Sequence, residues 1–128
     1  MTTEQVMTTQ EIADRLVELC REGKYNQVYQ ELFSPDCWSI EPEGVPSGTA
    51  KGMAAMQEKG KLWNEMVETF HSGSLSDPLV AADHFSIAWF SKITMKGAPG
   101  PIDMDEIAVY KVANGKVVSE QFFYTPQG

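Results

Sequence analysis

The sequence has few basic residues and no long hydrophobic segment, and these absences exclude several classes of function. No run of apolar residues is longer than four, so no segment is predicted to span a membrane. Lys and Arg number 10 against 18 Asp and Glu, which gives a net charge of −8, and no basic cluster occurs. Phosphate backbones and anionic lipids attract such clusters, so neither nucleic acid nor a membrane is expected as a partner.

The chain is also poor in cysteine, histidine and cofactor motifs. Cys20 and Cys37 lack metal-ligand spacing and are predicted to be reduced core thiols of a cytoplasmic protein. The first ten residues have neither the basic start nor the apolar segment of a signal peptide. His71 and His84 are isolated, so no metal site is predicted. Without a phosphate-binding glycine loop or a nucleophile elbow, no cofactor is expected.

The composition that remains is typical of one packed domain. Of the 128 residues, 42% are hydrophobic and 22% are charged, which favours a globule over a disordered chain. We expect a single domain over residues 1–128, with residues 1–7 as a loose N-terminal tail. A chain of this length is large enough to bury most of its apolar surface.

The first half of the chain is predicted to be mainly helical. Thr8 and Glu11 have the spacing of a capping box, and Gly23 suits the end of that helix. A shorter helix follows until Ser34-Pro35-Asp36, where we predict a turn before a strand over Cys37–Glu41. A third helix is predicted to begin near Thr49, and its end is ambiguous because 66–74 also suits a strand.

The second half is predicted to be β-structure. A weak strand is expected over 69–74 and one long, bent strand over 79–95. Strands over 102–112 and 116–125 are joined by Asn114-Gly115, the strongest hairpin signal in the chain. Helices followed by a mostly antiparallel sheet predict an α+β fold, with the helices on one face of a curved sheet.

Several local strings resemble the nuclear transport factor 2-like superfamily, in its SnoaL-like and ketosteroid isomerase-like branch. They are Leu32-Phe33, Glu41-Pro42-Glu43-Gly44, Ser47-Gly48-Thr49-Ala50 and Gly115-Lys116-Val117-Val118-Ser119. The resemblance implies a cystatin-like α+β barrel, in which a mixed, mostly antiparallel sheet forms a cone around the N-terminal helices and a pocket. It also implies a homodimer that pairs through the convex face of the sheet.

The resemblance places Glu41 where the isomerases keep a carboxylate general base. Leu16 stands where they have an oxyanion-binding Tyr, and counting back from Gly115 puts Ile107 where they have a protonated Asp. Glu106 is one residue away and, without a bulge, is expected to face the other side of the sheet. Steroid isomerisation is therefore not expected. The alternative for Glu41 is a surface position at the mouth of a loop.

Other residues are candidates for contact with a ligand. Alternation puts Glu120, Phe122 and Tyr124 on one face, so Glu120 is a second catalytic candidate beside Glu41; otherwise it is a solvated residue at the sheet edge. Trp63, His71 and Glu106 are further candidate ligand contacts. Core packing is the alternative for Trp63, and a structural role is the alternative for His71. Lys51 and Lys59, near the predicted third helix, are expected to point outward. The alternative is that Lys59 points inward, in which case its ion pair with Glu41 would favour the charged carboxylate and the site would be structural.

Three functional hypotheses follow. The chain is a cofactor-independent isomerase, cyclase or hydratase that uses a carboxylate base on a small, largely apolar carbonyl compound. Alternatively, it binds such a molecule without catalysis, or it is a dimerisation module whose cavity is filled by its own side chains. The aromatic and Met-rich composition favours an apolar ligand, and the polar candidates favour the first two hypotheses over the third.

Overall fold

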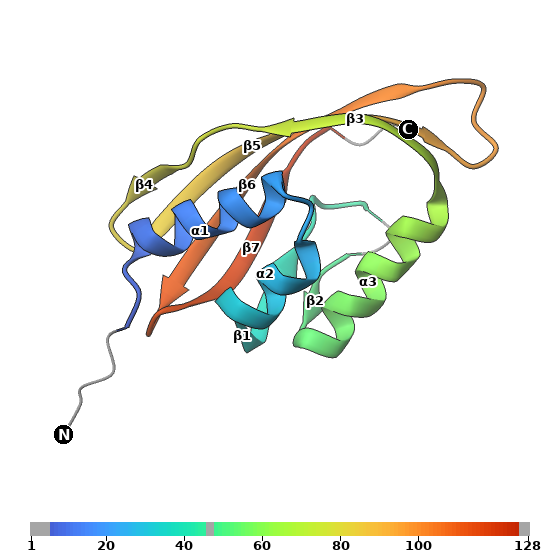
Figure 1. Ribbon diagram of the computed structural model, residues 1–128. Helices are drawn as coiled ribbons and strands as arrows, with labels where there is room; N and C mark the ends of the chain where they lie inside the picture. The colour runs from blue at the N-terminus through green and yellow to red at the C-terminus, as the bar shows by residue number, and fades with distance from the viewer. Residues whose placement is uncertain (1–5, 46–47, 126–128) are drawn as a thin grey trace.

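The computed structural model describes residues 6–45 and 48–125, which form a curved sheet with helices on its concave side (Figure 1). The helices are α1 (Thr9–Arg21), α2 (Tyr25–Leu32) and α3 (Met53–Met66). The strands are β1 (Phe33–Ile40), β2 (Ala50–Lys51), β3 (Val67–Leu75), β4 (Leu79–Ala81), β5 (His84–Met95), β6 (Ile102–Ala113) and β7 (Lys116–Phe123). The predicted tail over residues 1–7 lies mostly outside the described residues.

The sheet is mixed but mostly antiparallel. Its strand order is β2-β1-β7-β6-β5-β3, and β4 also pairs with β5. β1 and β7 run parallel, whereas the other pairs are antiparallel. The prediction of an α+β cone around the helices is therefore confirmed. No helix in the described part of the chain is both long and apolar enough to cross a membrane.

The start of the first helix is as predicted. The side chain of Thr8 accepts a hydrogen bond from the backbone of Glu11, and the Glu11 carboxylate accepts one from the backbone of Thr8. This capping box satisfies donors that the helix start leaves free. Gly23 follows the helix with φ +75°, a left-handed conformation that glycine adopts without strain.

The predicted turn at Ser34-Pro35-Asp36 is wrong, because β1 begins directly after α2, at Phe33. β1 pairs with β7 at Phe33 and again from Trp38 onward, with a register shift between the two. Proline has no N–H to donate, so it is tolerated where the ladder is interrupted. The irregularity therefore allows Pro35 to lie inside a strand.

Two other boundaries also differ from the prediction. α3 begins at Met53 and not near Thr49, because Ala50 and Lys51 pair with β1 before Gly52 (φ +87°) turns the chain into the helix. The expected single strand over 79–95 is a hairpin of β4 and β5. Its turn is Ala82-Asp83. Asp83 is a turn-forming residue type, but Ala82 has φ +53°, which the sequence does not indicate for alanine.

The last hairpin is confirmed. β6 and β7 are joined at Asn114 and Gly115, which have φ values of +52° and +74°. Positive φ at both central residues is typical of the two-residue turns that match the twist of a hairpin. Beyond the turn, the register of β6 and β7 shifts between Lys111 and Val112, and Glu120 then pairs with Tyr110.

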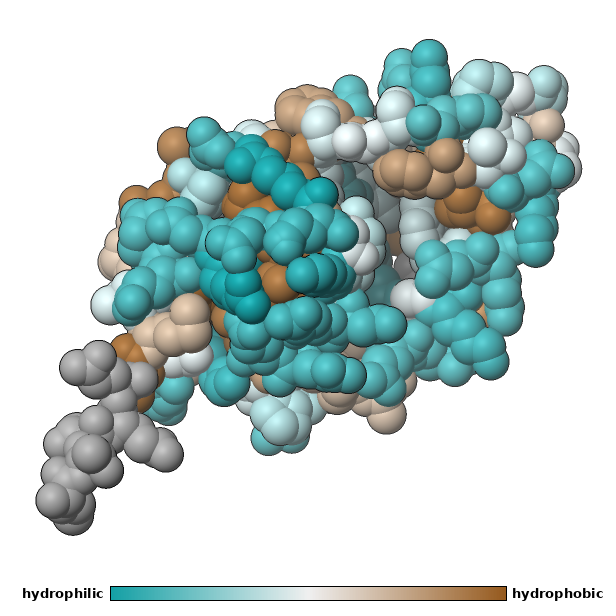
Figure 2. Space-filling view, viewed as in Figure 1, coloured by the Kyte–Doolittle hydropathy of each residue, from teal (hydrophilic) through white to brown (hydrophobic). Residues whose placement is uncertain are grey.

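The hydrophobic core fills only one half of the concave face. There α1 and α2 cover the sheet, and Leu16, Phe85 and Tyr110 are at most 2% exposed. The rings of Phe85 and Tyr110 are stacked with their centroids 4.7 Å apart. At the other half, α3 contacts the sheet at β1, β2 and β3, and the space-filling surface is hollowed between α3 and the other two helices (Figure 2).

Candidate functional site

A cavity of about 390 Å³ lies between α3 and the concave face of the sheet. Its walls are mainly aromatic and thioether side chains, contributed by α3, β3, β5, β6 and β7: Met56, Trp63, Met66, Phe70, Ile93, Met104 and Phe122. Its polar groups are fewer and comprise Ser39, Glu41, Lys59, Glu106, Glu120 and Tyr124. A cavity of this size, with apolar walls and few polar groups, is typical of a site for a small molecule.

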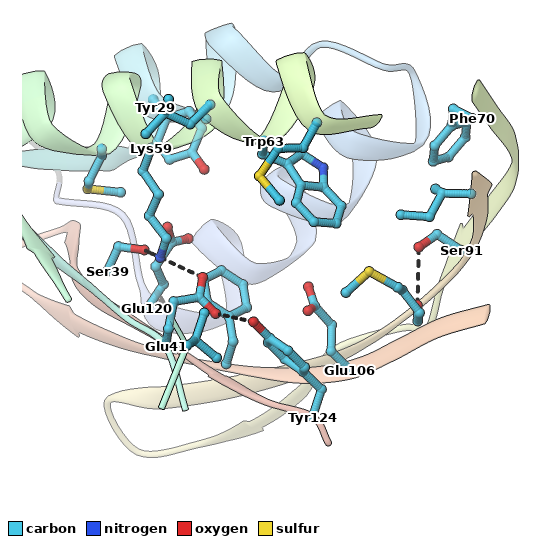
Figure 3. A pocket seen from close by; sticks show the side chains of 18 residues that line it. Tyr29, Ser39, Glu41, Lys59, Trp63, Phe70, Ser91, Glu106, Glu120 and Tyr124 are labelled. Carbon is cyan, nitrogen blue, oxygen red and sulfur yellow. Dashed lines mark hydrogen bonds and ion pairs between the residues drawn. The ribbon is translucent and has the colours of Figure 1, made fainter. Parts of the chain in front are cut away.

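Glu41 points into this cavity, from the position immediately after β1 (Figure 3). Its side chain is only 11% exposed. Oε1 lies 2.6 Å from the Lys59 Nζ, and Oε2 accepts a hydrogen bond of 2.8 Å from the Tyr124 hydroxyl. Both carboxylate oxygens are therefore held, one by a cation and the other by a phenol. Desolvation and the contact with Glu41 raise the pKa of Tyr124, which keeps the phenol protonated.

Lys59 points inward, which corrects the expectation that it points away from the cavity. Besides Glu41, its ammonium donates a hydrogen bond of 2.9 Å to the Ser39 hydroxyl and lies 5.4 Å from the centre of the Phe122 ring. Lys59 lies three residues after Met56 and four before Trp63, so all three occupy one face of α3. Helix α3 therefore places the positive charge of Lys59 within a row of apolar side chains.

Glu120 is buried at the inner end of the cavity, with 4% of its surface exposed. Burial raises the pKa of Glu120 to about 7. A hydrogen bond from Ser39 and the charge of Lys59 oppose that rise, whereas the charges of Glu41 and Glu106 add to it. The alternative of a solvated residue at the sheet edge does not describe its position. At neutral pH this carboxyl is divided between its neutral and charged forms.

Glu106, a candidate ligand contact, also lines the cavity, although counting along the strand without a bulge places it on the other side of the sheet. Inward positions alternate along β6, and Ala108 and Tyr110 are buried on the same face as Glu106. Burial, and then the charge of Glu41, raises the pKa of Glu106 to about 7. Among the described residues, none donates a hydrogen bond to Glu106 or forms an ion pair with it, and its carboxyl faces open space below Trp63 (Figure 3).

The two positions at which the isomerases keep their oxyanion-binding Tyr and Asp carry no polar group into the cavity. Leu16 is buried in the core under α1, and Ile107 is 51% exposed on the convex face. Asp103 is exposed on the same convex face as Ile107. An acid is nevertheless present on β6, because Glu106 occupies the inward position next to Ile107.

The remaining predicted ligand contacts are divided between the cavity and the surface. Phe122 and Tyr124 line the cavity on the same face as Glu120, as alternation indicates, and Trp63 lines it from α3 while staying 40% exposed. His71 is exposed on β3 and its ring nitrogen hydrogen-bonds to the Thr94 hydroxyl at 2.7 Å. The structure therefore does not bring His71 together with the others. Its neighbour Phe70 lines the cavity in its place.

Sequence reasoning missed Lys59 and Ser39 as site residues. The signal for Lys59 was its place on the stripe between Met56 and Trp63, where a charged residue on an apolar face indicates an inward partner. Ser39 shares its face of β1 with Cys37, which is fully buried. Within residues 6–45 and 48–125, no three His, Cys, Asp or Glu side chains are grouped as metal ligands would be.

Comparison with known proteins identifies relatives over nearly the whole chain. Residues 7–124 match the model of the SnoaL-like domain. A candidate SnoaL-like polyketide cyclase from Mesorhizobium loti is 32% identical and superposes with a TM-score of 0.86, covering 92% of this chain and 100% of that one. A search of proteins with curated functions gives no match.

More distant structures share the fold. A nuclear transport factor 2-like protein of unknown function from Burkholderia pseudomallei is 14% identical with a TM-score of 0.75, and the alignment covers 93% of this chain and 92% of that one. A Catenulispora acidiphila protein with a ketosteroid isomerase-like fold, in complex with trimethylamine, is 23% identical with a TM-score of 0.66, over 92% of this chain and 88% of that one.

Proposed function

Because this chain belongs to the SnoaL-like domain family, we propose that it binds a small, largely apolar carbonyl compound in its cavity and moves a proton on it without a cofactor. The reaction class is isomerisation, cyclisation or hydration. One observation carries this proposal: two carboxyls in the same apolar cavity have different surroundings. Glu41 is held by a cation and a phenol, whereas Glu106 has a pKa raised to about 7 and faces open space. Proteins assign acid and base roles to two groups of the same type by placing them in different surroundings.

The proposed roles follow from these surroundings. Glu41, as a carboxylate, takes a proton from the carbon next to the ligand carbonyl, and the electron pair moves to the carbonyl oxygen. Glu106, in its neutral form, donates a hydrogen bond to that oxygen and stabilises the developing enolate. The proton on Glu41 then returns to the same or another carbon. Glu120 lies deeper, behind Ser39 and Lys59, and is proposed to tune the charge of the site.

The alternative is binding without catalysis, and one specific observation favours it. Each oxygen of Glu41 already has a partner, Lys59 or Tyr124, so the carboxylate must weaken an existing contact to take a proton. A protein that only binds a ligand has no need to do so. The two functions therefore differ in whether a bound ketone exchanges protons.

Deuterium exchange into a ketone distinguishes them. With para-tert-butylacetophenone in D₂O, we expect the protein to accelerate exchange of the methyl protons next to the carbonyl, followed by NMR. Glu41→Gln and Glu106→Gln should each reduce the acceleration by at least about 100-fold, the usual size of a general acid or base contribution. Glu58→Gln, on the exposed side of α3, is the matched control. Ligand binding by all variants with no accelerated exchange would leave the binding function.

A homodimer is proposed as the functional assembly. Phe90, Ile107 and Phe123 are each about half exposed on the convex face, and Ile107 and Phe123 are direct cross-strand neighbours. Asp103 and Lys111 share that face, four residues to either side of Ile107. A two-fold axis near Ile107, across the strands, therefore brings Asp103 of one copy opposite Lys111 of the other.

The cytoplasm is proposed as the place of action. Cys20 and Cys37 are both free and buried. Burial raises the pKa of the Cys37 thiol to about 11, so it is unreactive as a nucleophile. Free thiols that serve only as small core residues are typical of a reducing compartment.

A further inference from the structure

Lys59 is the one basic residue among the described residues that line the cavity. Three carboxyl groups surround it: Glu41 from the end of β1, Glu106 from β6 and Glu120 from β7. The Lys59 side chain is 14% exposed, and its ammonium is bound to Glu41 and Ser39. Lys61, two residues further along α3, is exposed and serves as a natural control.

The walls around these carboxyls have the composition of a cation site. Trp63, Phe122 and Tyr124 present aromatic rings to the same space. Carboxylates combined with aromatic faces attract ammonium groups, by charge and by cation–π interaction. The ammonium of Lys59 already occupies the place over the Phe122 ring. The chain therefore supplies its own cation where a ligand cation would otherwise bind.

We propose that Lys59 determines the ligand specificity of the cavity: by neutralising Glu41 and occupying the cation position, it reserves the site for uncharged ligands and rejects cationic ones of the same shape. The inference rests on the proposed function only in taking the cavity as the ligand site. It does not depend on whether the ligand is turned over.

The specificity should depend on pH in a defined direction. The groups that face Glu106 and Glu120 are Lys59 from α3, Glu41 and Ser39 from β1, Tyr124 after β7 and Tyr29 from α2. Burial raises the pKa of both Glu106 and Glu120 to about 7, so each gains a negative charge as the pH rises through neutrality. Rejection of cations should therefore be strongest at about pH 6 and weaker at about pH 8.5.

Two ketones of equal shape test the proposal. Para-tert-butylacetophenone is neutral, and para-acetyl-N,N,N-trimethylanilinium replaces its quaternary carbon with a charged nitrogen. We measure the ratio of their dissociation constants near neutral pH. The wild type should favour the neutral ketone by at least about tenfold. Lys59→Met should move the ratio at least about tenfold toward the cation, whereas Lys59→Arg and Lys61→Met should leave it near the wild-type value.

Glu41→Gln provides the opposite test and does not require Lys59→Met to fold. It leaves the ammonium of Lys59 without its carboxylate, so rejection of the cation should increase. An unchanged ratio in both Lys59→Met and Glu41→Gln, or binding of neither ketone by the wild type, would overturn the inference. Absence of deuterium exchange with a normal shift in these ratios would instead reject only the catalytic part of the proposed function.

Discussion

The same strands form both halves of the concave face, but their inward residues are buried in one half and line a cavity in the other. On β5 and β6, Phe85, Ile87 and Tyr110 are buried under α1 and α2, whereas Ser91, Met104 and Glu106, further along the same faces, line the cavity. Alternation is regular throughout, so it does not distinguish the two halves. The difference lies in the helix above: α1 packs on β5, whereas α3 contacts β1, β2 and β3 and leaves a cavity over the inward residues between them (Figure 1).

This difference predicts that shortening a side chain in the core half lowers the free energy of unfolding much more than shortening one on the cavity wall. Phe85→Ala should lower the free energy of unfolding by about 3–5 kcal/mol, because Phe85 is 1% exposed and stacks on Tyr110. Met104→Ala, on the cavity wall, should cost about 1 kcal/mol or less, because its side chain already borders open space. Denaturant unfolding measures both. Equal losses would mean that the cavity end is packed as tightly as the core.

The cavity end should also make stability depend on pH. Glu106 and Glu120 have pKa values of about 7 in the folded protein, against an ordinary value of 4.5. Their neutral forms favour folding, so this stability is complete below pH 4.5 and is lost as the pH rises to about 7. For the fully buried Glu120, the loss is on the order of 3 kcal/mol.

Unfolding measured from pH 4.5 to 8 in the wild type and in Glu120→Gln tests this expectation. The variant should lose less stability across that range, since glutamine cannot ionise. Glu58→Gln, on the exposed side of α3, should follow the wild type. A pH profile of Glu120→Gln identical to that of the wild type would show that Glu120 titrates normally.

The sequence predicted features that depend on neighbouring residues better than it predicted features that depend on tertiary packing. The capping box at Thr8 and the turn at Asn114-Gly115 are local signals, and both elements formed as predicted. The sequence predicted β4 and β5 as one strand, because a single Asp in an apolar segment is a weak turn signal and the positive φ of Ala82 is not typical of alanine. Glu41 and Glu120 were recognised from strand position and alternation. Glu106 was a candidate ligand contact, but its inward direction did not follow from counting along the strand. Lys59 was expected to point outward, because its direction depends on how α3 lies over the cavity.

The convex face provides a third contrast, since its apolar residues have no helix above them. In the proposed dimer, Ile107→Asp places two negative charges beside the two-fold axis and should weaken association by about 100-fold or more. Sedimentation equilibrium at micromolar concentration measures it, and Tyr25→Asp, on exposed α2, is the control. A wild type that sediments only at the 14.2 kDa mass of one chain would exclude the dimer at that concentration.

A charge exchange tests the geometry of that dimer with a smaller effect. Asp103→Lys places a lysine opposite Lys111 of the other copy and should weaken association about tenfold. The double variant Asp103→Lys with Lys111→Asp should restore it, because the pairing is reversed and complementary again. A double variant as weak as Asp103→Lys alone would rule out the two-fold axis across the strands.

The central claim is that the open half of the cone holds an acid with a pKa raised to about 7, Glu106, in the same cavity as a carboxylate, Glu41, that is paired with Lys59. Carbon-detected NMR titration of the glutamate side chains, assigned with Glu106→Gln, tests it directly. We predict a midpoint for Glu106 near 7. A midpoint at or below the ordinary value of 4.5 would contradict the account, because Glu106 would then be a second carboxylate and no acid would face the ligand.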